Sequence, residues 1–97
     1  MPDLATFLSM ASCDQAVDDE VLGAVRFRYL TVWETMDLSS KHEGQERVLR
    51  MVHAMLAKAD PSLSYEQFLS LPDPVAARYV DLLTELVGGF RKRPPSS

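Results

Sequence analysis

The sequence predicts a small, mainly α protein: a single-domain helical bundle with one short N-terminal β-hairpin at about residues 14–30. A chain of 97 residues supports one hydrophobic core rather than two. Its 46% hydrophobic and 25% charged residues are typical of an ordinary globular chain. Between residues 43 and 87, apolar side chains recur mostly at helical spacing. We expect residues 1–90 to form the domain, and residues 91–97 to form a disordered basic tail that ends in proline and serine.

The first predicted element is a short helix from Leu4 to about Ala11, with Asp3 as its N-cap. Leu4, Phe7, Leu8 and Ala11 fall on one face of such a helix, because they are spaced by three and four residues. We expect this apolar face to pack against another surface.

Residues 21–31 fit two different structures. Apolar and aromatic residues alternate with Arg26 and Arg28, as in a strand, but some of the same residues also recur at helical spacing up to Met36. A single strand leaves its backbone hydrogen-bonding groups unpaired, so we expect it to pair with residues 14–18 as a hairpin. Failure of that pairing would favour the helix. In the strand, both arginines lie on one face and can pair with an acidic partner or, within the chain, with the acidic N-terminal turn.

Two longer helices should follow. Thr31 and Glu34 fit a capping box, which predicts a helix from this point to about Leu38. A central helix is predicted over residues 43–59. Its apolar stripe is formed by Val48, Leu49, Val52, Met55, Leu56 and Ala59.

The C-terminal third predicts two further helices. Pro61 and Pro72 lie on either side of a short predicted helix over residues 65–71, since proline cannot donate an intrahelical hydrogen bond. Asp73 is a good N-cap for a last helix over residues 74–87. We expect that helix to end at Gly88 or Gly89, where a left-handed residue costs least.

Composition narrows the possible partners and compartments. The net charge of −4 makes nucleic acid a poor partner, because the overall field repels a polyanion. Cys13 is the one cysteine, so we expect no internal disulfide and a small, semi-buried, inert thiol in a reducing cytoplasm. The N-terminus lacks the charged start of a secretory signal, and no apolar run reaches the ~18 residues of a membrane span. We therefore expect a soluble cytoplasmic protein without a membrane partner.

No residue pattern indicates catalysis, a metal site or a cofactor. His42 and Glu43 begin like a zinc-protease motif, but the second histidine four residues after the first is missing, because position 46 is glutamate. His53 lies about 16 Å farther along a helix that would include both, too far to share one ion with His42. We expect a protein that is not an enzyme.

Large apolar side chains instead suggest protein binding. The last helix carries more of them than one contact face needs, which favours a second face for self-association or for a partner. Burial in the core is the competing interpretation for each one, since a small domain needs most of its large apolar residues inside. The candidate partner-binding residues are Trp33, Phe68, Tyr79, Leu83, Leu86 and Phe90.

Two stretches carry a resemblance to a known family. Residues 22–34 read Leu-Gly-x-Val-x-x-Arg-x-Leu-Thr-x-x-Glu, and residues 63–71 read Leu-Ser-x-Glu-x-Phe-x-x-Leu before a closing helix. With the order of predicted elements, they make most of the chain resemble the tail assembly chaperones of long-tailed bacteriophages. The resemblance implies a protein of the infected host's cytoplasm, absent from the mature virion, which binds the tape measure protein or another tail component. Such a chaperone keeps its client soluble and promotes tail tube assembly.

Other functions compete with this one. The first alternative is a small phage-encoded regulatory or inhibitor protein that binds its target through the acidic N-terminal region. A DNA-binding helical regulator is disfavoured, because the predicted helix at residues 65–71 has no lysine or arginine to contact phosphates.

Overall fold

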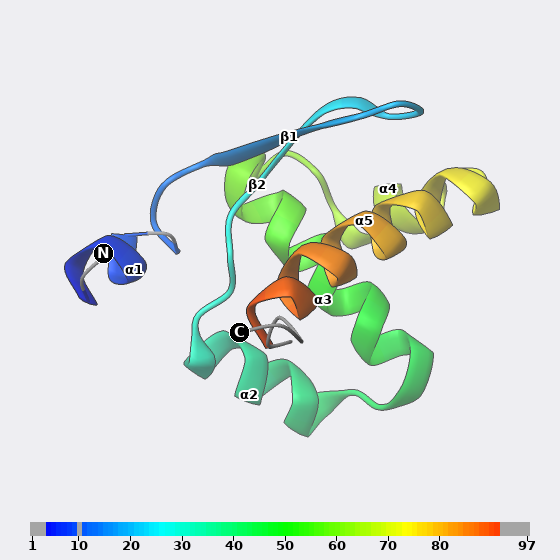
Figure 1. Cartoon of the computed structure of the whole chain (residues 1–97). Helices are drawn as coiled ribbons and strands as arrows, with labels where there is room; N and C mark the ends of the chain where they lie inside the picture. The colour runs from blue at the N-terminus through cyan, green and yellow to red at the C-terminus, as the bar shows by residue number, and fades with distance from the viewer. Residues whose placement is uncertain (1–3, 10, 92–97) are drawn as a thin grey trace.

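The computed structural model describes residues 4–9 and 11–91, with side chains up to residue 88, and Figure 1 shows their arrangement. A two-stranded hairpin lies across one side of a group of helices, and a short N-terminal helix stands apart from that group. The predicted mainly α fold is confirmed for these residues. In chain order the elements are α1 (Leu4–Ser9), β1 (Gln15–Asp19), β2 (Gly23–Phe27), α2 (Val32–Lys41), α3 (Gly44–Ala59), α4 (Tyr65–Leu69) and α5 (Asp73–Arg91).

The hairpin confirms the strand prediction, and the helical alternative for residues 21–31 is wrong. β1 and β2 pair antiparallel, with Val17 opposite Val25. Val25 and Phe27 are buried in the core, while Arg26 between them is exposed. This period of two places both apolar side chains on the face toward the helices, as a strand does.

Asp19 and Gly23 shape the turn between the strands. The Asp19 carboxylate accepts hydrogen bonds from the backbone N–H groups of Val21 and Leu22, each at 3.0 Å. Gly23 has a φ of 77°, in the left-handed region where a residue with a Cβ is strained.

Replacing Gly23 by alanine should lower the free energy of unfolding by roughly 1–2 kcal/mol. An added methyl group meets no atom within 4 Å, so the whole cost comes from the backbone conformation. Gly88→Ala is the matched control, because Gly88 lies in α5 without a positive φ and also has open space around its Cα. That change should raise the free energy of unfolding by roughly 0.5–1 kcal/mol. Urea unfolding measures both; shifts of the same sign would contradict this account.

The start of α2 follows the predicted capping chemistry, whereas α5 begins at Asp73 itself, the residue predicted as its N-cap, and the Val75 N–H donates to the Pro72 carbonyl at 2.9 Å. In α2, the Thr31 hydroxyl accepts from the Glu34 N–H, while the Glu34 carboxylate accepts from the Thr31 N–H at 2.8 Å. α2 continues to Lys41, beyond the predicted end at Leu38. α3 has the predicted extent apart from Glu43, which is its N-cap.

Two short helices end earlier than predicted. α1 stops at Ser9 rather than about Ala11, and the Ser9 hydroxyl donates to a carbonyl of its own helix at 2.7 Å. α4 stops at Leu69 rather than Leu71. Pro72 follows, and proline disfavours the helical conformation in the residue before it. The predicted cap Asp3 lies outside the described residues.

α5 does not end at the predicted glycines. It runs to Arg91, and Gly88 does not take the left-handed conformation that terminates helices. A glycine inside a helix costs only about 0.5–1 kcal/mol relative to alanine, so a helix that packs against the core can continue through it. The rest of the predicted tail, residues 92–97, lies outside the described residues.

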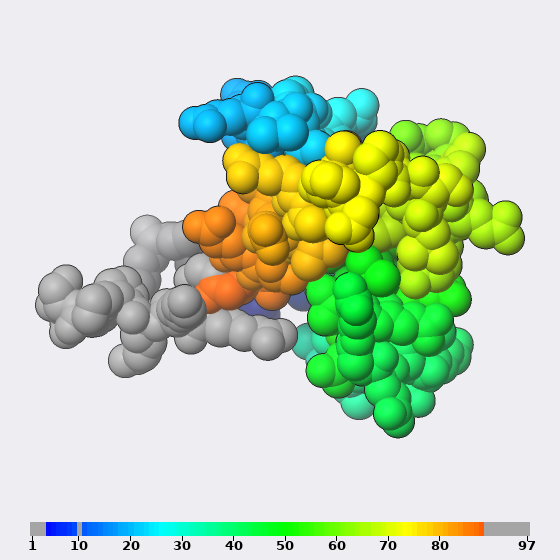
Figure 2. Space-filling view, turned by 90° about the vertical axis from the view of Figure 1, so that its right-hand side faces the viewer, coloured from blue at the N-terminus to red at the C-terminus, as the bar shows by residue number. Residues whose placement is uncertain are grey.

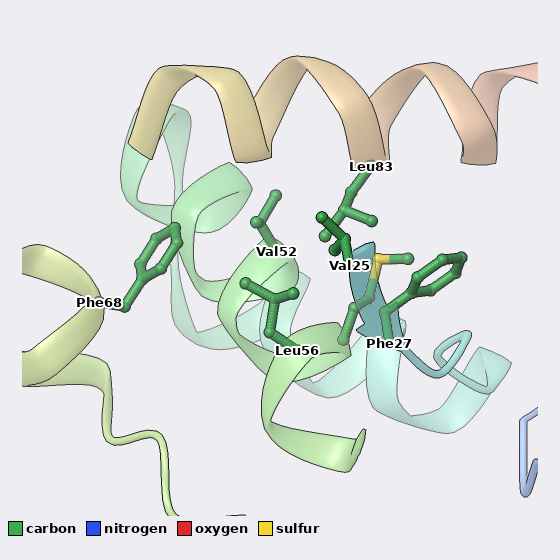
Figure 3. Packing of buried hydrophobic residues seen from close by; sticks show 7 residues of the cluster. Val25, Phe27, Val52, Leu56, Phe68 and Leu83 are labelled. Carbon is green, nitrogen blue, oxygen red and sulfur yellow. The ribbon is translucent and has the colours of Figure 1, made fainter. Parts of the chain in front are cut away.

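One apolar cluster holds the hairpin and the helices together. Phe68 from α4 and Leu83 from α5 point toward α3, which contributes Val52 and Leu56 (Figure 3). The buried members of the core are Val25, Phe27, Val52, Met55, Leu56, Phe68 and Leu83. No charged side chain among the described residues is buried with them.

An ion pair fixes the hairpin onto α5, on which it lies in Figure 2. Asp19 Oδ1 lies 2.8 Å from Nη2 of Arg78. The Arg78 hydrogen bonds, with the turn N–H groups of Val21 and Leu22, lower the pKa of Asp19 from 3.8 to about 2 against the opposing effect of burial. The folded state therefore favours the ionised carboxylate.

Asp19 should make folding stability depend on pH in acid. Because its folded-state pKa is lowered, its contribution is complete above pH 3.8 and is lost as the pH falls through about 2. Asp19→Asn should be less stable at neutral pH and should lose less stability over this interval than the wild type. Free energies of unfolding in urea at several pH values measure this. Asp18→Asn, at the exposed neighbouring position, is the control, and equal slopes for Asp19→Asn and wild type would contradict the assignment.

Candidate protein-binding surface

An uncharged groove opens between α2, α3 and the C-terminal half of α5, with a volume of about 550 Å³. Figure 1 shows how α2, α3 and α5 are arranged, and the groove is lined by residues of all three and of the connection from β2 to α2. The described residues that line this α2–α5 groove are Tyr29, Leu30, Val32, Thr35, Met36, Val48, Met51, Val52, Met55, Leu83, Thr84, Val87 and Gly88. None carries a charge, so the groove suits an apolar occupant.

A lysine of α3 holds α2 at the edge of the groove. Lys58 Nζ donates to the Glu34 carboxylate at 2.7 Å and to the Tyr29 carbonyl at 3.0 Å. Burial opposes ionisation of Glu34, but the hydrogen bonds from Lys58 and the Thr31 N–H outweigh it and lower the pKa of Glu34. The carboxylate thus caps α2 and ties it to α3.

Large apolar side chains extend the surface beyond the groove. On α2, Val32, Trp33 and Met36 are 75%, 82% and 59% exposed, and the first and last of them line the groove. Met36 is a neighbour of both Val32 and Trp33 on the helix surface, since they lie four and three residues before it, so Trp33 lies next to a residue that lines the groove. Together they form an exposed apolar cluster on α2.

A second exposed apolar face lies on α1. The face was expected to pack against another surface, and the described chain does not cover it: Leu4, Phe7 and Leu8 are all exposed, and no residue of α1 is buried. After α1, the Ser12 and Cys13 N–H groups donate to the Ser9 carbonyl. Cys13 is exposed rather than semi-buried.

The predicted partner-binding residues separate into different environments. Trp33 lies at the surface, whereas Phe68 and Leu83 are both 0% exposed. Those two belong to the core, because α4 and α5 point them at α3, and neither is available to a partner in this conformation. Tyr79 and Leu86 are partly buried against the same core. The side chain of Phe90 lies outside the described residues.

The sequence prediction did not select Val32 and Met36, which border the groove, or Leu4, Phe7 and Leu8, which form the exposed face of α1. For α1, the helical spacing already indicated an apolar face in need of a partner. For α2, no local signal separates an exposed apolar face from a buried one, because exposure depends on how the other elements pack around the helix.

Two of the acidic N-terminal residues, Asp14 and Asp19, form ion pairs within the chain. Asp14 pairs with Arg26 at 2.6 Å and also with Arg28, and hydrogen bonds from these two arginines lower its pKa. Of the two pairings that the sequence left open for the strand arginines, the structure shows the one within the chain. Asp19 is held by Arg78, which leaves Asp18 and Glu20 exposed.

Both histidines have structural partners. The His53 ring nitrogen Nε2 lies 2.9 Å from the Leu63 carbonyl oxygen. Nδ1 of His42 lies 3.5 Å from Oε1 of Glu46, in the first turn of α3. Across residues 4–9 and 11–91, no three His, Cys, Asp or Glu side chains come together as metal ligands do. In the same ranges, no helix has both the length and the apolar character that crossing a bilayer requires.

Comparisons of this chain with protein-family models, curated proteins and solved structures found no match.

Proposed function

We propose that this chain is a protein-binding chaperone that holds an apolar helical segment of a client in the α2–α5 groove. The observation that carries the proposal is the uncharged groove bordered by exposed Val32, Trp33 and Met36. An amphipathic helix can lay its apolar face into such a groove, and aromatic residues beside the opening supply large contact area. One groove of this size covers a short stretch of client, so binding is reversible and several copies can cover a long one.

The client we propose is the tape measure protein of a long-tailed bacteriophage, or another tail component, in the host cytoplasm. This part rests on the resemblance of residues 22–34 and 63–71 to tail assembly chaperones. The first stretch forms β2 and the start of α2, and it contributes Tyr29, Leu30 and Val32 to the groove. The second forms α4 and carries the core residue Phe68. The resembling stretches thus build the groove wall and its support.

Co-expression with a tape measure protein tests the proposal. The client should become soluble and should co-purify with several copies of this chain. Met36→Asp, which puts a charge in the groove at a position 59% exposed, should abolish recovery of the soluble client without unfolding the chain. A client that stays insoluble with the wild-type chain, or one solubilised equally by Met36→Asp, would contradict the proposal.

A charge-reversal variant separates this function from inhibition through the acidic region. Asp18→Lys combined with Glu20→Lys changes two exposed acidic side chains that belong to neither the Asp14 nor the Asp19 ion pair, and it leaves the groove intact. Asp19 is unsuitable for reversal, because it holds Arg78 and the hairpin turn. A chaperone that binds through the groove should keep its client in this variant. Loss of the client here, with retention in Met36→Asp, would favour the acidic region instead.

A further inference from the structure

α2 packs on the rest of the chain more loosely than α3 or α5 does. None of its ten residues is buried, whereas α3 buries Val52, Met55 and Leu56 and α5 buries Leu83. A segment with few buried apolar contacts opens at a low free-energy cost. α2 can therefore move away from the other helices while the core stays packed.

One side chain of α3 fastens α2 in place. Lys58 pairs with Glu34 at 2.7 Å, and among the described residues this is the one ion pair that joins α2 to another element. The same ammonium group donates to the Tyr29 carbonyl, in the connection that leads into α2, at 3.0 Å. A single group thus holds both the first turn of α2 and the chain before it, so the loss of its hydrogen bonds releases both.

The connection from α2 to α3 has the features of a hinge. His42 and Glu43 are extended, with φ of −135° and −134°, and Gly44 has a φ of 61°. A Cβ at Gly44 would meet no atom within 4 Å, so this corner has space to change its backbone conformation. Hinges are a few residues at the ends of elements that absorb such changes. Figure 1 shows α2 joined to β2 and to α3 by connections that are neither helix nor strand.

The floor of the α2–α5 groove is out of reach in this arrangement. Val52, Met55 and Leu83 line the groove, yet they are only 1%, 3% and 0% exposed. Val32 and Met36 of α2 line the same groove. A client in the groove as it stands would contact the rim and not the floor. Displacement of α2 would add three apolar side chains to the contact, which favours binding.

We propose that α2 is a hinged cover of the α2–α5 groove, which swings about residues 42–44 when Lys58 releases Glu34 and the Tyr29 carbonyl, and so uncovers the floor of the groove. The opening itself needs no client. Its use rests on the proposed function: a client helix that contacts the floor binds the open form, and its binding shifts the population toward that form.

Thiol labelling of the full chain without a client measures the opening. In a Cys13→Ser background, Met55→Cys places a thiol in the floor of the groove, and Leu56→Cys places one beside it in the core but outside the groove. Both native side chains are buried, so labelling requires an opening. Lys58→Met should raise the labelling rate of the first thiol at least about 10-fold, because charge-assisted hydrogen bonds no longer hold the cover. The second thiol should respond far less.

Lys41→Met is the matched control. It removes the same charge, but Lys41 pairs with Asp37 within α2, so both labelling rates should stay unchanged. Glu34→Gln breaks the ion pair from the other side and still caps the helix, so it should also raise the labelling rate in the groove floor. Equal rates for Lys58→Met and Lys41→Met would overturn the proposal. An equal rise at both thiols would also overturn it, because the whole core would then be opening.

A client assay separates the cover from the proposed function. Apparent affinity scales with the fraction of the chain that is open, so Lys58→Met should bind the client more tightly by the same factor that raises the labelling rate. Equal affinity for Lys58→Met and Lys41→Met would overturn the use of the cover in client binding. A chain that binds no client in any form would overturn the proposed function alone, because the labelling rates are measured without a client.

Discussion

Replacing Phe68 by alanine should lower the free energy of unfolding by about 3–5 kcal/mol. The ring is 0% exposed, and it meets Tyr79 edge-on with the ring centroids 6.5 Å apart. Its removal leaves a cavity between α3, α4 and α5 that the surrounding helices only partly fill. A domain of this size has a total stability of about 5–15 kcal/mol, so the loss is a large fraction of it. Urea unfolding followed by circular dichroism measures the change.

The neighbouring residue provides the matched control. Leu69 is 52% exposed on the same short helix, so Leu69→Ala should change the stability far less than Phe68→Ala does. Phe68→Leu keeps most of the side-chain volume and should lower the free energy of unfolding by less than about 1.5 kcal/mol. A Phe68→Ala variant within 1 kcal/mol of wild type would mean that α4 contributes little to the core.

Local chemistry predicted most of the fold. The capping box at Thr31 and Glu34 depends on residues three apart, and the strand at Val25 and Phe27 depends on a period of two. Both features can therefore be predicted from neighbouring residues without knowledge of the tertiary structure. The end of α5 was mispredicted for the same reason. Gly88 offers a helix end locally, but packing of α5 against the core decides whether the helix uses it.

The α2–α5 groove could not be predicted from patterns within single segments of the sequence. Its walls come from residues 29–36, 48–55 and 83–88, and no spacing within any one segment shows that they meet. Leu83 and Trp33 are both large and apolar, and both lie on helices, yet one is 0% and the other 82% exposed. That difference arises from long-range packing. Candidate partner-binding residues selected only by size and apolarity therefore included both core residues and surface residues.

Replacing Trp33 by alanine should weaken client binding by roughly 30-fold or more, because a tryptophan that a partner covers contributes about 2 kcal/mol or more to an interface. Its side chain is 82% exposed beside the groove, so the same change should alter folding stability by no more than about 0.5 kcal/mol. Titration of a labelled client segment measures the affinity, and urea unfolding measures the stability. Leu83→Ala makes the opposite comparison: it should lower stability by about 2–5 kcal/mol, since Leu83 is a core residue. Unchanged affinity in Trp33→Ala would place the client away from the exposed face of α2 and would remove the main support for the groove as its binding site.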